Sequence, residues 1–112
     1  MGKIRVILAD DYIPYRWSVL AELSGNPSIE IVEEASDGEE AVRKALEHLP
    51  DVVLLDLHMP KFDGHEATRQ ILSEMPNIKI IINTISDNES DLEMALKAGA
   101  RGYLVKEGGL SK

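Results

Sequence analysis

The sequence predicts an α/β protein built on a parallel β-sheet of five strands. The first observation is an alternation along the 112 residues: short apolar runs are followed by stretches with apolar residues at helical spacing, in four complete pairs plus a fifth run. Such alternation is typical of parallel sheets with helices on both faces. The second observation is the apolar fraction of 44%, which is enough to fill one core. No repeat or linker interrupts the pattern, so we expect a single domain over residues 1–112.

The five predicted strands differ in how far they are buried. Residues 52–55 are four apolar residues between Pro50 and Pro60, and residues 4–9 are also mostly apolar. We expect both strands to lie centrally, with 52–55 covered on both faces. Residues 29–35 mix apolar residues with three glutamates, as suits a sheet edge. The remaining predicted strands are 78–84 and 101–105.

The first predicted helix, 12–24, has an inward and an outward face. At about 100° per residue, one side of this helix carries an apolar stripe. The stripe consists of Tyr15, Val19 and Leu23, flanked by Arg16 and Leu20. Trp17 points away from the stripe, so we expect its side chain to be exposed and to belong to a contact surface.

The other three predicted helices begin at N-cap residues. The pairs Ser36/Glu39 and Ser86/Glu89 have capping-box spacing, and Asp63 can cap the third helix. The inward faces are expected to contain Ala41, Val42, Ala45, Leu46 and Leu49 in the second helix, Ala67 and Ile71 in the third, and Leu92, Ala95, Leu96 and Gly99 in the fourth.

Charge and composition exclude several classes of function. The formal net charge is -8, which argues against binding of nucleic acid by this chain alone, because such binding depends on neutralising phosphates. There is no cysteine, so disulfides and thiolate chemistry are excluded. No apolar run approaches the ~20 residues of a membrane span, and no signal peptide is visible. We therefore expect a cytoplasmic location without membrane contact.

Four of the five predicted strands end in polar residues. In chain order these are Asp10 with Asp11, Asp56, Thr84 and Lys106. Because the carboxyl ends of parallel strands meet at one edge of a sheet, we expect these side chains to share a pocket. Three carboxylates are hard oxygen ligands that suit Mg²⁺, and the metal and the ammonium group together would balance their charge. Such a site suits phosphoryl transfer with a carboxylate as the nucleophile.

Four motifs carry a resemblance to a known family. They are 9–11, 55–60 with 63–64, Thr84, and 98–106. Together they resemble the receiver domain of a two-component response regulator, and the last motif with 58–60 resembles the NarL/LuxR branch in particular. The resemblance implies a flavodoxin-like, doubly wound sheet in the order 2-1-3-4-5. It also implies that this receiver is a fragment of a longer response regulator, in which a helix-turn-helix DNA-binding domain usually follows.

The resemblance further implies roles for residues at the sheet edge. Asp56 would accept a phosphoryl group from a sensor histidine kinase. Asp11, Asp56 and the backbone carbonyl of His58 would bind Mg²⁺ directly, while Asp10 would act through water. The protein would not be a conventional enzyme, although it would assist the phosphorylation and dephosphorylation of its own aspartate.

Three further residues would respond to phosphorylation in a protein of this family. Lys106 would contact the phosphoryl oxygens, Thr84 would swing to hydrogen-bond them, and Tyr103 would follow inward. This movement would remodel the surface formed by the fourth helix and the fifth strand. Trp17 would belong to a docking face for the kinase or for a second copy in a homodimer. DNA would be contacted only through an output domain.

Three features depart from the family pattern. Asn83 stands in an apolar run and needs hydrogen-bond partners if it is buried. Ile85 follows Thr84 where many receivers have a small residue, which could hinder access to Asp56. The final helix is missing or truncated, because residues 107–112 are too few to form it. The last two departures leave open a receiver-like module that dimerises without phosphorylation.

Other interpretations are weaker. A phosphatase with an aspartyl-phosphate intermediate would place a second acid where His58 stands, and a flavin-binding module would not place two acids at its phosphate loop. Asp10 and Asp11 could also simply cap the first helix. His48, His58 and His65 are expected to be surface residues rather than metal ligands.

Overall fold

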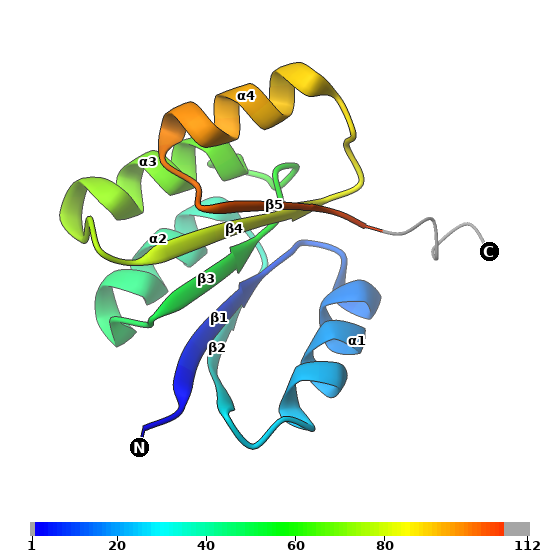
Figure 1. The fold of residues 1–112 in the computed structure, drawn as a ribbon, viewed down its shortest axis with the longest axis vertical. Coiled ribbons are helices and arrows are strands. Elements are labelled where there is room, and N and C mark those ends of the chain that lie inside the picture. The colour runs from blue at the N-terminus through cyan, green and yellow to red at the C-terminus, as the bar shows by residue number, and fades with distance from the viewer. Residues whose placement is uncertain (1, 107–112) are drawn as a thin grey trace.

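The sheet is parallel, five-stranded and ordered β2-β1-β3-β4-β5, as predicted (Figure 1). The computed structural model describes residues 2–106. The strands are β1 (Ile4–Ala9), β2 (Ile29–Ala35), β3 (Val52–Leu55), β4 (Lys79–Thr84) and β5 (Gly102–Val105). β2 pairs only with β1 in the described sheet and therefore lies at the edge, as its three glutamates indicated.

Helices cover both faces of the sheet, but unequally (Figure 1). The helices are α1 (Ile13–Ser24), α2 (Gly38–His48), α3 (Gly64–Glu74) and α4 (Glu89–Ala98). α2, α3 and α4 pack side by side on one face, whereas α1 alone lies on the other and contacts β1 and β2.

The two faces of the central strands are buried to different extents. Val53 and Leu55 of β3 point toward the three-helix layer and are fully buried, together with Ile80 and Ile82 of β4. Leu54, on the opposite face, is only half-buried. The expectation that residues 52–55 are covered on both faces is therefore met only in part, because α1 covers mainly the β1–β2 side.

The N-caps of two helices lie later in the chain than expected. Asp37, not Ser36, caps α2: its carboxylate accepts a 2.7 Å hydrogen bond from the backbone N–H of Glu40. The Glu40 side chain in turn accepts the N–H of Ser36 at 2.6 Å. Asn88 caps α4 by accepting the N–H of Ser90. Capping-box spacing does not distinguish the N-cap residue from the residue beside it. Which of the two caps the helix depends on where the backbone changes from extended to helical.

Four leucines and one glycine expected on inward helix faces lie elsewhere. The exposed leucines are Leu46, Leu49, Leu92 and Leu96. In α2 and α4 the small residues Ala41, Ala45 and Ala95 are fully buried at the contacts, so the helices approach their neighbours closely and the buried stripe is narrow. Leu49 and Gly99 follow the ends of α2 and α4 and adopt left-handed conformations.

Two remaining expectations concern the membrane and the end of the chain. Within residues 2–106, no helix is long and apolar enough to cross a lipid bilayer. The predicted lack of a final helix concerns residues 107–112, which lie outside the described part of the chain.

Candidate functional site

Backbone hydrogen bonds between neighbouring strands place the predicted site residues at one edge of the sheet. The N–H of Asp56 donates to the carbonyl of Ala9 at 3.0 Å, so Asp56 follows directly on β3 beside the end of β1. The N–H of Lys106 donates to the carbonyl of Thr84 at 2.7 Å, which places Lys106 beside the end of β4. Residues up to 96 positions apart in the sequence therefore meet at the carboxyl edge of the sheet.

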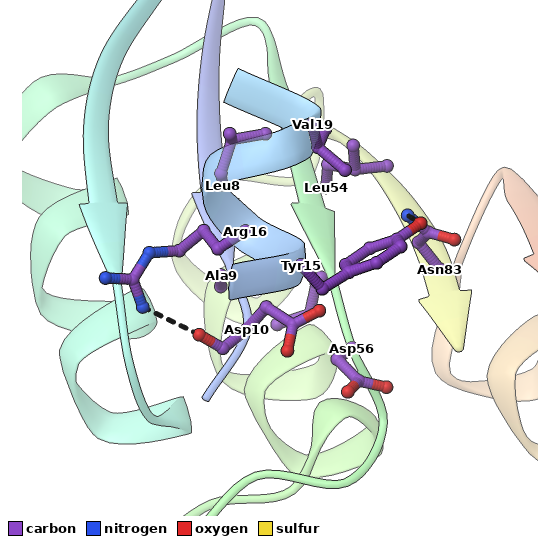
Figure 2. A pocket seen from close by; sticks show the side chains of 10 residues that line it. Leu8, Ala9, Asp10, Tyr15, Arg16, Val19, Leu54, Asp56 and Asn83 are labelled. Atoms are coloured by element: carbon purple, nitrogen blue, oxygen red, sulfur yellow. Dashed lines mark hydrogen bonds between the residues drawn. The ribbon is translucent and has the colours of Figure 1, made fainter. Parts of the chain in front are cut away.

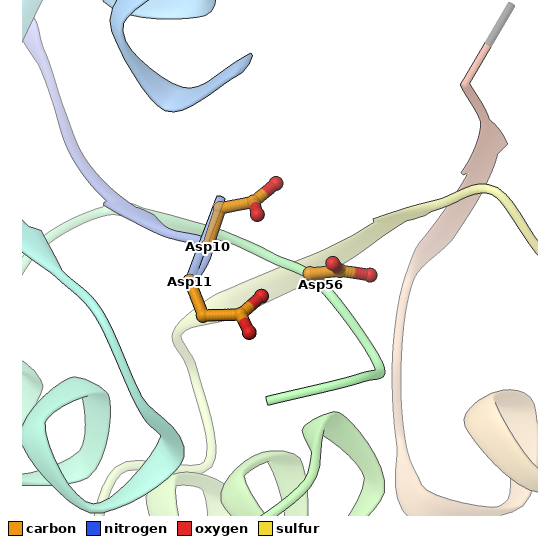
Figure 3. Close-up of side chains that lie close together, drawn as sticks. All are labelled: Asp10, Asp11 and Asp56. Atoms are coloured by element: carbon orange, nitrogen blue, oxygen red, sulfur yellow. The ribbon is translucent and has the colours of Figure 1, made fainter. Parts of the chain in front are cut away.

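Three carboxylates cluster at this edge (Figure 3). Asp10, Asp11 and Asp56 each place an oxygen within 4.8 Å of the others. Asp10 and Asp56 are buried, with 6% and 7% of their surface exposed, whereas Asp11 is open to solvent. Three like charges this close repel one another unless cations offset them. The donor set is hard oxygen and one side is accessible, so these residues fit Mg²⁺.

Lys106 supplies one of those cations. Its ammonium group is 2.7 Å from Oδ2 of Asp10 and 3.4 Å from Oδ2 of Asp56, and only 8% of the residue is exposed. Burial by itself lowers the pKa of this amine, but the hydrogen bond to Asp10 and the charges of Asp56 and Asp10 outweigh burial and raise the pKa above its ordinary value. Lys106 is therefore charged in the folded protein and is not a solvated surface lysine.

The position of Asp10 is held by contacts that the sequence did not reveal. Its Oδ1 accepts the N–H of Tyr12 at 2.9 Å, and its backbone carbonyl accepts the buried guanidinium of Arg16 at 2.8 Å (Figure 2). The same guanidinium pairs with Glu34 at 2.8 Å and donates to Ser36. One available signal was the place of Arg16 beside the inward stripe of α1, where a charged side chain needs buried partners.

The predicted switch residues meet in the loop after β4. Thr84 is fully buried, and its hydroxyl accepts the N–H of Ser86 at 3.4 Å. The Tyr103 hydroxyl donates to the carbonyl of Ser86 at 3.0 Å. Burial, opposed by this hydrogen bond and reinforced by nearby carboxylates, raises the pKa of the Tyr103 phenol. One short loop thus connects Thr84, β5 and the start of α4.

Two predictions about individual side chains, Trp17 and Asn83, agree with the structure, and the hindrance expected from Ile85 stays a prediction. Trp17 is 59% exposed on α1, and Ile13, one turn earlier, is also exposed. Asn83 is half-buried and finds the partner it needs, because its amide donates to the hydroxyl of Tyr15 at 3.0 Å (Figure 2). Ile85, expected as a possible obstacle to Asp56, is 65% exposed.

The histidines follow the expectation only in part. His58 is exposed, its side chain does not belong to the carboxylate cluster, and its N–H lies 3.5 Å from Oδ1 of Asp56. His65 contradicts the expectation of a surface residue, since only 6% of it is exposed. It lies in the first turn of α3 against α4, where Nε2 is 3.8 Å from Asp91. Among residues 2–106 neither ring nitrogen finds a hydrogen-bond partner.

Comparisons with known proteins agree with this geometry. Residues 6–112 match the family model described as response regulator receiver domain. The transcriptional regulatory protein LiaR of Bacillus subtilis is 46% identical over 103 residues, covering 92% of this chain and 49% of LiaR. The transcriptional regulatory protein DegU of Brevibacillus brevis is 41% identical over 106 residues, covering 95% of this chain and 45% of DegU. The chain thus spans about half the length of these relatives.

Solved structures show the same fold. The signal receiver domain of the response regulator NarL from Mycobacterium tuberculosis has a TM-score of 0.92 at 34% identity, covering 96% of this chain and 86% of that one. A CheX–CheY–BeF₃–Mg²⁺ complex from Borrelia burgdorferi matches with a TM-score of 0.86 at 30% identity, covering 95% of this chain and 80% of that one.

Proposed function

Because this chain belongs to the receiver domains of response regulators, with relatives of the NarL/LuxR type, we propose that Asp56 accepts a phosphoryl group from a histidine kinase. The observation that carries the proposal is the meeting of three carboxylates with the ammonium of Lys106 at one sheet edge. Asp56 follows directly on β3 in this cluster, and the cluster offers cationic compensation for a second negative group.

The proposed transfer uses the carboxylate of Asp56 as the nucleophile. One of its oxygens forms a bond to phosphorus, the bond from phosphorus to the histidine nitrogen of the donor breaks, and the electron pair stays on the imidazole. Lys106, now hydrogen-bonded to Asp10 and near Asp56, would turn its ammonium toward the phosphoryl oxygens. Hydrolysis of the acyl phosphate would return Asp56 to its resting state.

We assign the metal site to the same edge. Asp11, Asp56 and the backbone carbonyl of His58 would hold Mg²⁺ directly, and Asp10 would act through water. The proposal is supported by the clustered oxygens, by the accessibility of Asp11, and by the Mg²⁺ named in the CheX–CheY complex. When bound, the metal would offset charge on the transferring group.

The proposed output runs through the loop after β4. Thr84 would bond the phosphoryl group, and Tyr103 would move inward as the loop around Ser86 shifts. Leu92 and Leu96, one turn apart on α4, expose apolar surface, which supports a change in dimerisation on this face. Since relatives are transcriptional regulators twice as long, DNA would be bound by an additional output domain.

Trp17 is proposed as part of the kinase-docking or dimer face. Its exposed indole lies one turn after Ile13, which is also exposed, so the two residues offer apolar surface on α1. Large aromatic side chains of this kind contribute most to the binding energy of protein interfaces.

The phosphoacceptor assignment is tested by weighing the intact chain after incubation with Mg²⁺ and a small phosphoryl donor such as acetyl phosphate. The expected result is a gain of one phosphoryl group, absent in Asp56→Asn and absent when Mg²⁺ is chelated. A folded parent chain that gains no mass would contradict the proposal and favour a module that dimerises without phosphorylation. The exposed apolar surface of α4 is the observation that favours this second function.

A further inference from the structure

Tyr15 makes a contact with Lys106 that the proposed chemistry has not used. The Lys106 ammonium lies 4.0 Å from the centre of the Tyr15 ring. The phenol oxygen of Tyr15 accepts a 3.0 Å hydrogen bond from the amide of Asn83 (Figure 2). Three elements that are far apart in the sequence, α1, β4 and the end of β5, therefore converge on one side chain.

The Tyr15 ring and two carboxylates surround the ammonium group of Lys106. Two directions around it are taken by the carboxylates of Asp10 and Asp56, and the Tyr15 ring faces it as well. Only 4% of the Lys106 side chain remains exposed. A cation on an aromatic face is attracted by the ring quadrupole, and the attraction is strongest where water is excluded.

Asn83 fixes the orientation of the Tyr15 ring by a hydrogen bond to its hydroxyl. A half-buried amide that follows the apolar residues 80–82 of β4 is costly unless it is hydrogen-bonded, and the phenol of Tyr15 is its partner. The bond links the tip of the ring to β4, the strand that also ends in Thr84. A residue that only filled the cavity between α1 and the sheet, as Val19 does, would need neither the bond nor the cation.

We propose that Tyr15 is a positioning residue for Lys106: its ring, anchored by Asn83, holds the ammonium group between Asp10 and Asp56 where phosphoryl oxygens would arrive. The inference rests on the proposed phosphoryl transfer for its consequence, but the contact itself exists without a phosphoryl group. It therefore predicts an effect on reaction rate and, separately, a coupling in stability.

The rate is measured on the intact chain with Mg²⁺ and acetyl phosphate, by the gain of mass with time. Tyr15→Leu, which removes the ring, should slow phosphorylation roughly tenfold. Tyr15→Phe, which keeps the ring and loses the bond to Asn83, should slow it less than about threefold. Val19→Ala, a control in the same cavity and helix, should lower stability without slowing the reaction.

The Lys106→Met background separates positioning from general packing. If Tyr15 acts through Lys106, Tyr15→Leu should cause no further slowing in that background. Equal slowing by Tyr15→Leu and Val19→Ala, or an undiminished Tyr15→Leu effect in Lys106→Met, would overturn the proposal.

An unfolding cycle tests the contact without any phosphoryl donor. Tyr15→Leu, Lys106→Met and the double variant are unfolded in urea, and their equilibrium constants are compared with the parent's. Each single substitution should raise the unfolding equilibrium constant by some factor. In the double variant, this constant should be about fivefold smaller than the product of the two factors predicts, because both substitutions remove the same contact. Independent effects would refute the contact. A parent that takes up no phosphoryl group, while the coupling is present, would refute the phosphoacceptor function alone.

Discussion

Gly64 shows how a single residue shapes the site. A Cβ atom at this position would lie 2.5 Å from the carbonyl oxygen of Asp56 and 2.8 Å from the Cα of Leu57. The Gly64 N–H donates to the Leu57 carbonyl at 2.8 Å, so the loop returns directly onto the backbone that carries Asp56. Only glycine allows this approach, because any side chain would push the loop and α3 away from Asp56, the proposed phosphoacceptor.

Gly64→Ala should therefore destabilise the protein by about 2 kcal/mol or more, since the clash is with backbone atoms that cannot change rotamer. The measurement is the free energy of unfolding from urea titration. Gly25→Ala is the matched control, because its Cβ would meet nothing closer than 3.6 Å and its φ is -74°. This control should be neutral or slightly stabilising. Equal effects of both substitutions would show that the close approach at Gly64 does not exist in solution.

At the scale of elements, the loop between β4 and α4 connects the site to the surface. Ser86 is its central residue: its hydroxyl donates to Asp91 in α4 at 2.6 Å, and its carbonyl accepts the hydroxyl of Tyr103 in β5. Its N–H donates to the Thr84 hydroxyl. A displacement of Thr84 would therefore be transmitted to α4 and β5 through short polar contacts.

The raised pKa of Tyr103 predicts how this connection responds to pH. A phenol whose pKa is raised by folding stabilises the protein fully below its unfolded pKa of about 10, and this contribution is lost as the pH rises through the folded pKa. Near neutral pH, the free energies of unfolding of the parent and of Tyr103→Phe should differ by a constant amount. Above about pH 10, the free energy of unfolding of the parent should fall relative to that of the variant. Urea titrations across this range make the comparison. Parallel curves above pH 10 would contradict the assigned environment of Tyr103.

For the whole molecule, the net charge of -8 and the clustered carboxylates predict that stability depends on cations. An ion that binds only the folded state stabilises it by mass action, by about 2.7 kcal/mol at a hundredfold excess over Kd. Mg²⁺ should therefore raise the melting temperature of the parent, and Asp11→Asn should abolish most of that rise.

The control for this prediction removes the same charge at the opposite edge of the sheet. Asp51 precedes β3 and accepts the N–H of Arg5, away from the cluster. Asp51→Asn should lower the melting temperature in general but keep the full response to Mg²⁺. If the two variants respond equally to Mg²⁺, the ion acts by general screening and the proposed metal site is wrong.

The sequence by itself determined the alternation of strands and helices along the chain, the edge position of β2, and the convergence of Asp10, Asp11, Asp56 and Lys106. These features follow from local periodicity and from the rule that parallel strands end at one edge. The exposure of Trp17 followed from helical spacing in the same way. These sequence patterns each span only a few residues, and they do not depend on how the helices and strands pack.

Only the tertiary structure decided which side chains meet between elements. Periodicity marks a face, but not how close the neighbouring helix comes, so Leu96 is exposed while His65 is buried against α4. The guanidinium of Arg16 and the ring of Tyr15 likewise acquire their partners from strands distant in the chain. The physical reason is that burial and hydrogen bonding of long side chains depend on distances between elements, which no local pattern contains.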